Sequence, residues 1–131
     1  MKLDILFVDD EVNVVHGLKR MLRPLRNEWN FYFAYGGKEA LEIMKEHRID
    51  VIVSDMIMPE MSGAELLEKV KEKYPSVIRY ILSGYSKEAF ALQSAKTAHQ
   101  FIAKPIAPEE LKEKITRSRK LHSIHIFTMK N

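Results

Sequence analysis

Hydrophobic residues along this chain occur in two alternating arrangements. Short uninterrupted apolar runs predict buried strands, whereas apolar residues that recur at helical spacing predict helices with one buried face. Five strands are expected at residues 3–8, 31–35, 51–54, 77–82 and 100–103. Five helices are expected between and after them: at residues 14–25, around 40–44, from 62, over about 87–95, and from 108.

Capping and turn residues mark where several of these elements begin. Ser62 and Glu65 have the spacing of a capping box, which predicts a sharp helix start. Pro108 is followed by two glutamates, as is typical of a first helical turn. Gly36-Gly37 predicts the turn after the second strand, and Trp29 is expected in the loop before that strand.

Strands that alternate with helices predict one fold class. The expected fold is a doubly wound α/β domain, with a five-stranded parallel sheet covered by helices on both faces. Right-handed crossovers leave few arrangements of these strands. Because the first and third strands both end in aspartates, we expect them to be neighbours at a switch point in the strand order, where open α/β sheets bind ligands.

The aspartates are the most informative polar residues. Asp9 and Asp10 follow the first strand, and Asp55 follows the third. Adjacent strands lie about 4.8 Å apart, so these carboxylates should meet at the carboxyl edge of the sheet. Like charges crowded together are costly, and a cation should therefore sit among them. Oxygen ligands favour a hard divalent ion, most plausibly Mg²⁺, which keeps positions open for phosphate oxygens.

Two further groups belong to the same edge. Ser83 follows the fourth strand and Lys104 follows the fifth. A hydroxyl, an ammonium, three carboxylates and Mg²⁺ are the equipment of phosphoryl transfer, with the carboxylate of Asp55 as the nucleophile. Each residue also has an ordinary structural interpretation: Asp10 as a helix N-cap, Ser83 as a turn residue and Lys104 as a surface lysine. Only the combination is specific.

Composition restricts the function classes. The chain has 131 residues, a formal charge of +3 and no cysteine, which fits one domain in a reducing compartment and excludes thiolate chemistry. No apolar run approaches the roughly 20 residues of a membrane span, and charged residues interrupt the amino terminus. A cytoplasmic location is expected. Basic residues concentrate towards the carboxy terminus, but a solvated helix face explains them better than nucleic-acid binding.

The strand-end motifs resemble those of a response-regulator receiver domain, the phosphorylatable module of two-component signalling. The resemblance covers nearly the whole chain and includes Val8-Asp9-Asp10, Leu82-Ser83-Gly84 and Ala103-Lys104-Pro105. It also includes the stretch from Ser54 to Gly63, Ser-Asp-Met-Ile-Met-Pro-Glu-Met-Ser-Gly. It implies the flavodoxin-like strand order 2-1-3-4-5. The three methionines of the stretch are expected to fill core or loop rather than bind a soft metal.

The resemblance also implies a role for each site residue. Asp55 would be the phosphoacceptor, and Asp10, Asp55 and the main-chain carbonyl of Ile57 would bind Mg²⁺, with Asp9 assisting through water. Ser83 and Lys104 would bind phosphoryl oxygens. Ser83 and Phe101 would form the switch, in which phosphorylation draws Ser83 toward Asp55 and Phe101 turns inward. Many members of the family have tyrosine where this chain has Phe101. Because phenylalanine has no hydroxyl group, a hydroxyl-mediated contact in the active state is impossible here.

Partners and domain limits follow from the same resemblance. A histidine kinase or phosphotransfer protein would supply the phosphoryl group, and the face of the fourth helix, fifth strand and fifth helix would contact an output domain, a partner or a second copy. Residues 1–120 would form the receiver, and residues 121–131 an extension or the start of a linker to a missing output domain. The segments near residues 83–86 and 98–105 resemble receivers that precede HD-related (HDOD or HD-GYP type) domains. The receiver would not be an enzyme beyond its own phosphoryl transfer and autodephosphorylation.

Two other classes are compatible with parts of the pattern. A haloacid-dehalogenase-like hydrolase also uses an aspartate nucleophile and Mg²⁺, but its second acid lies two residues after the first, whereas Asp9 and Asp10 are adjacent. A binding module is the other class. This chain lacks the glycine-rich phosphate loop that a nucleotide-binding module would have, which weakens that version. A receiver-like scaffold that docks partners without phosphorylation is the remaining alternative.

Overall fold

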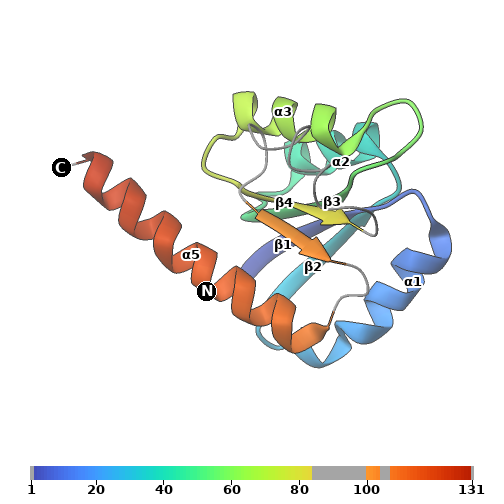
Figure 1. Cartoon of the computed structure of the whole chain (residues 1–131), viewed down its shortest axis with the longest axis horizontal. Helices are drawn as coiled ribbons and strands as arrows, with labels where there is room; N and C mark the ends of the chain where they lie inside the picture. The colour runs from blue at the N-terminus through green and yellow to red at the C-terminus, as the bar shows by residue number, and fades with distance from the viewer. Residues whose placement is uncertain (1, 84–99, 104–106, 131) are drawn as a thin grey trace.

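The chain folds into a parallel sheet with helices on both faces (Figure 1). The computed structural model describes the backbone of residues 2–83, 100–103 and 107–130, and the side chains of residues 2–82 and 107–119. The strands are β1 (Leu3–Val8), β2 (Trp29–Ala34), β3 (Val51–Asp55), β4 (Ile78–Ser83) and β5 (Gln100–Ala103). The helices are α1 (Val12–Met21), the short 3-10 helix η1 (Arg23–Leu25), α2 (Gly37–Glu46), α3 (Gly63–Lys73) and α5 (Pro108–Lys130).

The strand order confirms the predicted topology. The order is β2-β1-β3-β4-β5, and all four pairings are parallel. Val8 lies opposite Ser54, so β1 and β3 end side by side and the residues that follow them meet at the carboxyl edge. The order reverses direction at β1, and ligands of open α/β sheets bind at such points.

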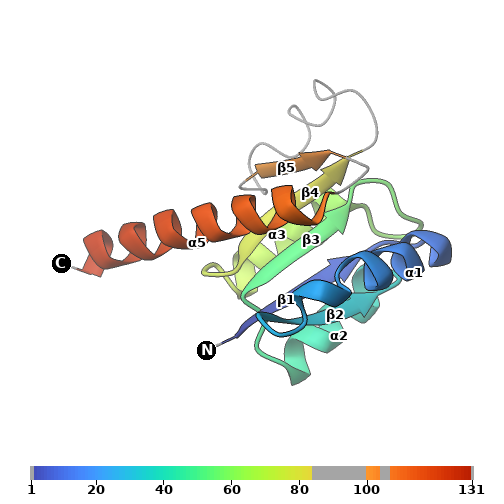
Figure 2. The same cartoon turned by 90° about the horizontal axis from the view of Figure 1, so that it is seen from below.

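The sheet separates two hydrophobic cores. One core lies between the sheet and the helices α1 and α5, and includes Phe7, Val53, Tyr80 and Leu111. The other lies on the opposite face, where α2 and α3 pack against residues such as Leu6 and Ile52 (Figures 1 and 2). Successive strand residues point to opposite faces, so continuous apolar runs such as Ile5–Val8 in β1 are buried on both faces. Within the described residues, none of the helices is long and apolar enough to cross a membrane.

Several element boundaries differ from the sequence expectations. Trp29 is the first residue of β2 and not part of the preceding loop, because its indole is buried and its ring centroid lies 6.3 Å from that of Phe31. Gly36 caps α2 and Gly37 is already helical. Strand β4 begins one residue later than predicted and includes Ser83. The helix expected over residues 87–95 lies outside the described residues.

Helix α5 begins at Pro108, as predicted, and no end was predicted for it. Its backbone remains helical through Lys130, beyond the predicted domain limit at residue 120, and its last turns extend past the sheet (Figure 2). The described part is held against β4 by Tyr80, whose hydroxyl donates to the Lys114 carbonyl at 2.9 Å and also pairs with the Ser118 hydroxyl. A continuous helix therefore occupies residues 121–130.

Candidate functional site: an acidic cluster at the carboxyl edge

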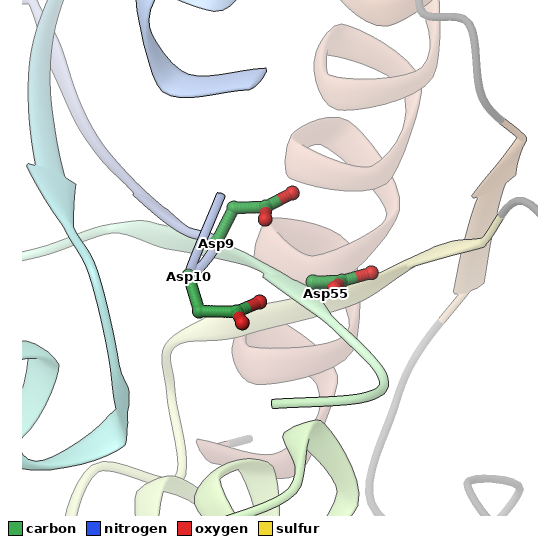
Figure 3. Close-up of side chains that lie close together, drawn as sticks. All are labelled: Asp9, Asp10 and Asp55. Carbon is green, nitrogen blue, oxygen red and sulfur yellow. The ribbon is translucent and has the colours of Figure 1, made fainter. Parts of the chain in front are cut away.

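Three aspartates come together at the carboxyl edge of the sheet. Asp9, Asp10 and Asp55 each offer a carboxylate oxygen within 4.8 Å of the others. Figure 3 shows Asp9 and Asp10 at the end of β1 and Asp55 at the end of β3. The predicted meeting of these residues is confirmed.

Asp9 is fixed in place by the main chain around it. Its side chain is only 1% exposed, and Oδ1 accepts the N–H of Glu11 at 3.0 Å. Its own N–H donates to the Ala34 carbonyl at 3.1 Å, which extends the contact between β1 and β2. The N-cap of α1 is Glu11, without a side-chain cap bond, so the interpretation of Asp10 as an N-cap is wrong. The Asp10 side chain is instead part of the carboxylate cluster.

Asp55 is positioned by a close approach of two chain segments. The N–H of Gly63 donates to the Met56 carbonyl at 2.8 Å, which brings the first residue of α3 against the end of β3. A Cβ atom at Gly63 would lie 2.1 Å from the Asp55 carbonyl oxygen. Only glycine fits there. The capping box predicted at Ser62 and Glu65 is present and fixes the start of the same helix.

The loop between Asp55 and Gly63 forms one rim of the site. Ile57 is 67% exposed, whereas Met56 and Met58 are buried in the core, as predicted for these methionines. The Met61 N–H donates to the Pro59 carbonyl at 2.7 Å, and the residue between them, Glu60, has φ of 66°. This is a γ-turn with positive φ, a strained conformation for a residue other than glycine.

The chemistry of the cluster fits a hard divalent cation. Three carboxylates within 4.8 Å concentrate negative charge at the end of an otherwise apolar sheet. Their oxygens are the ligand type that Mg²⁺ prefers, and fewer protein ligands than its octahedral shell requires would leave positions for other oxygens. A cleft of about 840 Å³ opens beside Asp10, with Tyr35, Lys38 and Met61 among its lining residues. A second reactant could therefore reach Asp10, whereas Asp9 and Asp55 are not among the residues that line the cleft.

Comparison with known proteins identifies the family of this chain. A sequence profile of the response regulator receiver domain matches residues 5–116. The chain belongs to the response regulator receiver family. The predicted strand order and the acidic cluster are therefore features of a receiver domain, a signalling module rather than a conventional enzyme.

Relatives and solved structures agree with this assignment. The sensor kinase CckA of Brucella abortus is 36% identical over 110 residues, which cover 82% of this chain and 11% of that protein. This chain therefore spans about a tenth of the length of that relative. The receiver domain of an HD domain-containing protein from Pseudomonas fluorescens superposes with a TM-score of 0.84 at 23% identity, covering 94% of this chain and 98% of that one.

A third comparison concerns a receiver that holds a metal. The receiver domain of the sensor histidine kinase PA1611 from Pseudomonas aeruginosa, solved with a magnesium ion in its active-site cleft, has a TM-score of 0.78 at 20% identity. The match covers 89% of this chain and 97% of that one. At this identity the likeness shows the shared fold alone.

The remaining predicted site residues are described only in part. Leu82 pairs with Asp55 and Ser83 pairs with Ala103, so the backbone of Ser83 lies one residue beyond Asp55 at the same edge of the sheet. Phe101 lies in β5, as expected. The side chains of Ser83 and Phe101, and all of Lys104, lie outside the described residues, so their roles stay predictions.

Sequence reasoning missed one part of the site. Gly63 belongs to the motif that follows Asp55, but no physical role was predicted for it, whereas in the structure it allows α3 to approach the end of β3. Its position directly after the capping Ser62 was the available signal, because glycine is unfavourable inside a helix and needs a local reason there.

Proposed function

We propose that this receiver domain accepts a phosphoryl group on Asp55 from a histidine kinase or phosphotransfer protein and changes its binding surface as a result. The observation that carries the proposal is the carboxylate cluster of Asp9, Asp10 and Asp55, with ligand oxygens within 4.8 Å of one another. Membership of the receiver family supports the same activity. We place the domain in the cytoplasm, where such kinases present their phosphohistidine.

The three aspartates would hold Mg²⁺ for this reaction. Asp10 and Asp55 would bind it directly, with the main-chain carbonyl of Ile57, and Asp9 through a water molecule. When bound, Mg²⁺ neutralises negative charge on the cluster and on the transferring phosphoryl oxygens. Asp9 is buried and accepts a hydrogen bond from the Glu11 N–H, and both would hold its carboxylate in place within the cluster.

The transfer itself would be a substitution at phosphorus. A carboxylate oxygen of Asp55 forms the new O–P bond while the P–N bond of the donor phosphohistidine breaks, and the released imidazole keeps its electron pair. The products are an acyl phosphate on Asp55 and a neutral histidine once the imidazole has its proton. Ser83 and Lys104 would bind phosphoryl oxygens, which places a donor hydroxyl and a positive charge where negative charge develops.

Signalling would follow from a change in the face formed by the fourth helix, β5 and α5. Ser83 would move toward the phosphoryl group and Phe101 would turn inward. An output domain, a partner or a second copy of the chain would read this face, and it must bind the two forms with different affinity for the switch to signal. An HD-related output domain rests on the resemblance of the segments near residues 83–86 and 98–105 to receivers that precede such domains, and the shared fold with the receiver of an HD domain-containing protein is consistent with it. In that arrangement residues 1–120 are the receiver and residues 121–131 begin the connection.

A phosphorylation-independent docking scaffold is the alternative function. It would use the same fold and the same exposed faces, without chemistry at Asp55. The accessible cleft beside Asp10 favours the phosphorylated receiver, because a scaffold has no need of room next to the cluster.

Intact mass measured after incubation with acetyl phosphate tests the proposal. We expect the protein to gain one phosphoryl group with Mg²⁺ and none without it, and the Asp55→Asn variant to gain none under either condition. Acetate is the leaving group in this reaction, so no kinase is needed. A phosphoryl group that persists in the Asp55→Asn variant would contradict the role of Asp55. No gain under any condition, repeated with phosphorylated kinase, would leave the docking scaffold as the function.

A further inference from the structure

A groove lies at the amino edge of the sheet, at the opposite end of the strands from the acidic cluster. Its volume is about 990 Å³, and its walls come from the ends of α2 and α3, the loops that precede β3 and β4, and Arg119 of α5. Leu3, Ile49 and Val77 are buried and line it close to where β1, β3 and β4 begin. The groove therefore combines an apolar base with exposed walls.

Basic side chains predominate in these walls. The charged residues that line the groove are Lys45, Glu46, Arg48, Asp50, Lys73 and Arg119. Arg48 makes only a long contact, 3.7 Å from Nε to Asp50, and its side chain is 79% exposed. Asp50 is already engaged by the Asp4 N–H at 2.9 Å. Among the residues that the structure describes, Lys73 and Arg119 form no ion pair, so the groove carries an excess of positive charge.

Helix ends explain some of these cations but not all of them. Lys45 and Lys73 lie in the last turns of α2 and α3, where a basic residue favourably complements the helix dipole. Arg48 directly follows the C-cap of α2, His47, whereas α5 continues eleven residues past Arg119, from 120 to 130. Arg119 therefore needs an explanation other than a helix end.

A buried guanidinium braces one wall of the groove. Arg79 of β4 is 6% exposed and donates to the carbonyls of Pro75 and Val77, at 3.3 and 3.0 Å, in the loop that forms one wall. Burial lowers the pKa of Arg79, because removing water disfavours the charged form. This guanidinium is held by main-chain carbonyls and is not among the residues that line the groove.

We propose that this groove docks an acidic segment of a partner protein. Carboxylates of the segment pair with Arg48 and Arg119, which come from different segments of the wall, and an apolar side chain packs against the half-buried Tyr74 in the same groove. This proposal does not depend on phosphorylation of Asp55. The site is an interaction surface at the far edge of the receiver from its chemistry.

The helix ends favour a peptide over a compact phosphate ligand. Phosphates bind where helix N-termini direct their N–H groups at the ligand. Here α2 and α3 present their C-terminal carbonyls to the groove, and these repel a concentrated double charge. Single carboxylates spread along an extended segment can pair with long arginine side chains at a distance from those carbonyls.

Peptide titration of the isotopically labelled protein tests the proposal. The probe is a short acetylated peptide of glutamates around one central leucine, and its control has glutamine in place of each glutamate. We expect the acidic peptide to shift the amide signals of residues 45–50, 73–77 and those near 119, and the control to shift none of them. In the double variant Arg48→Gln/Arg119→Gln the affinity should fall about five- to tenfold, since two exposed ion pairs are lost.

A matched variant separates a specific groove from general attraction to a basic protein. Arg20 and Arg23 are also exposed, and Arg20→Gln/Arg23→Gln removes the same charge away from the groove, so its affinity should stay within about twofold of the original. Equal losses in the two double variants would overturn the proposal. So would the absence of shifts at millimolar peptide, or shifts of the groove amides by inorganic phosphate at equal ionic strength that match those by the peptide. Phosphoryl acceptance at Asp55 should be the same in all these variants.

Discussion

The two edges of the sheet hold their charged residues in different ways. At the carboxyl edge, Asp9 and Asp55 are almost fully buried and sit among main-chain contacts, with like charges side by side. At the amino edge, Arg48 and Arg119 are exposed on long side chains, and acidic residues lie among the basic ones. Chemistry on a phosphoryl group needs fixed geometry, whereas docking of an extended segment needs charge and reach. The rigid edge suits the first and the adaptable edge suits the second.

The same comparison predicts where substitutions will be costly. A buried cluster of like charges lowers stability, and a protein retains such a feature where function requires it. Exposed charges contribute little to folding. Changes at the carboxyl edge should therefore have large effects on stability, of either sign, and changes at the amino edge should be smaller unless they remove a hydrogen bond.

The largest effect is expected at Gly63. In Gly63→Ala the new methyl group would lie 2.1 Å from the Asp55 carbonyl oxygen and 3.0 Å from the Met56 Cα atom, and both are main-chain atoms that cannot move independently. We expect a loss of about 3 kcal/mol in the free energy of unfolding, measured by urea denaturation, with weaker phosphoryl acceptance because Asp55 is displaced.

Gly17→Ala is the matched control for this change. Gly17 lies inside α1, and nothing lies within 4 Å of a Cβ atom built there. Alanine should raise the free energy of unfolding by about 0.5–1 kcal/mol, because glycine is unfavourable inside a helix. Equal stabilities of the two alanine variants would refute the close approach at the carboxyl edge.

Removing one carboxylate from each edge should change stability in opposite directions. Asp10→Ala relieves repulsion within the cluster and should stabilise the metal-free protein by about 1 kcal/mol. Asp50→Ala removes the acceptor of the Asp4 N–H and should destabilise by about 1–2 kcal/mol. Urea denaturation with a metal chelator present measures both. When Mg²⁺ replaces the chelator, it should stabilise the Asp50→Ala variant but not the Asp10→Ala variant. If the two substitutions change the free energy of unfolding in the same direction in chelator, the contrast between the edges is contradicted.

The sequence alone was sufficient for much of this fold. Apolar runs such as the one in β1 predict buried strands of a parallel sheet when they alternate with amphipathic stretches. The parallel topology then brings Asp9 and Asp55 to one edge of the sheet. The strand start at Trp29 was missed because a large aromatic next to polar Asn30 has no clear periodicity, and its burial is decided by tertiary packing.

The cationic groove could not be predicted in the same way. Its residues come from four separate segments, and in the sequence each of its basic residues belongs to an ordinary polar stretch. The role of Gly63 was hidden for a similar reason, because the atoms that require glycine belong to a residue eight positions earlier, Asp55. Strand ends are visible in a sequence, whereas close contacts between loops are not.

A third prediction concerns α5, which runs from one edge of the sheet to the other. Tyr80→Phe removes the hydroxyl that bonds the Lys114 carbonyl and Ser118, and should cost about 1 kcal/mol at neutral pH. Burial raises the pKa of Tyr80 above its ordinary value of 10.0, although its bond with Ser118 acts in the opposite direction. The native state therefore holds this proton more tightly than the unfolded state does.

The sign of the pH dependence follows from that shift. The contribution of Tyr80 is fully present below pH 10.0, the ordinary pKa, and is lost as the pH rises through the raised value of the folded protein. The stability difference between the original protein and Tyr80→Phe, measured by urea denaturation, should be constant below pH 10.0 and should shrink in the interval above it. A constant difference across this interval would show that Tyr80 titrates alike in both states.

The smallest effect is expected at Glu60, on the rim of the acidic cluster. Its φ of 66° in the γ-turn between Pro59 and Met61 strains any residue with a Cβ atom. Glu60→Gly relieves that strain but gives the unfolded chain more freedom, so we expect a net gain of only about 0.5 kcal/mol in the free energy of unfolding. Glu60→Ala keeps the Cβ atom and should gain nothing. If the alanine variant is as stable as the glycine variant, the gain comes from removing a negative charge near the cluster, and charge rather than backbone strain limits stability at this edge.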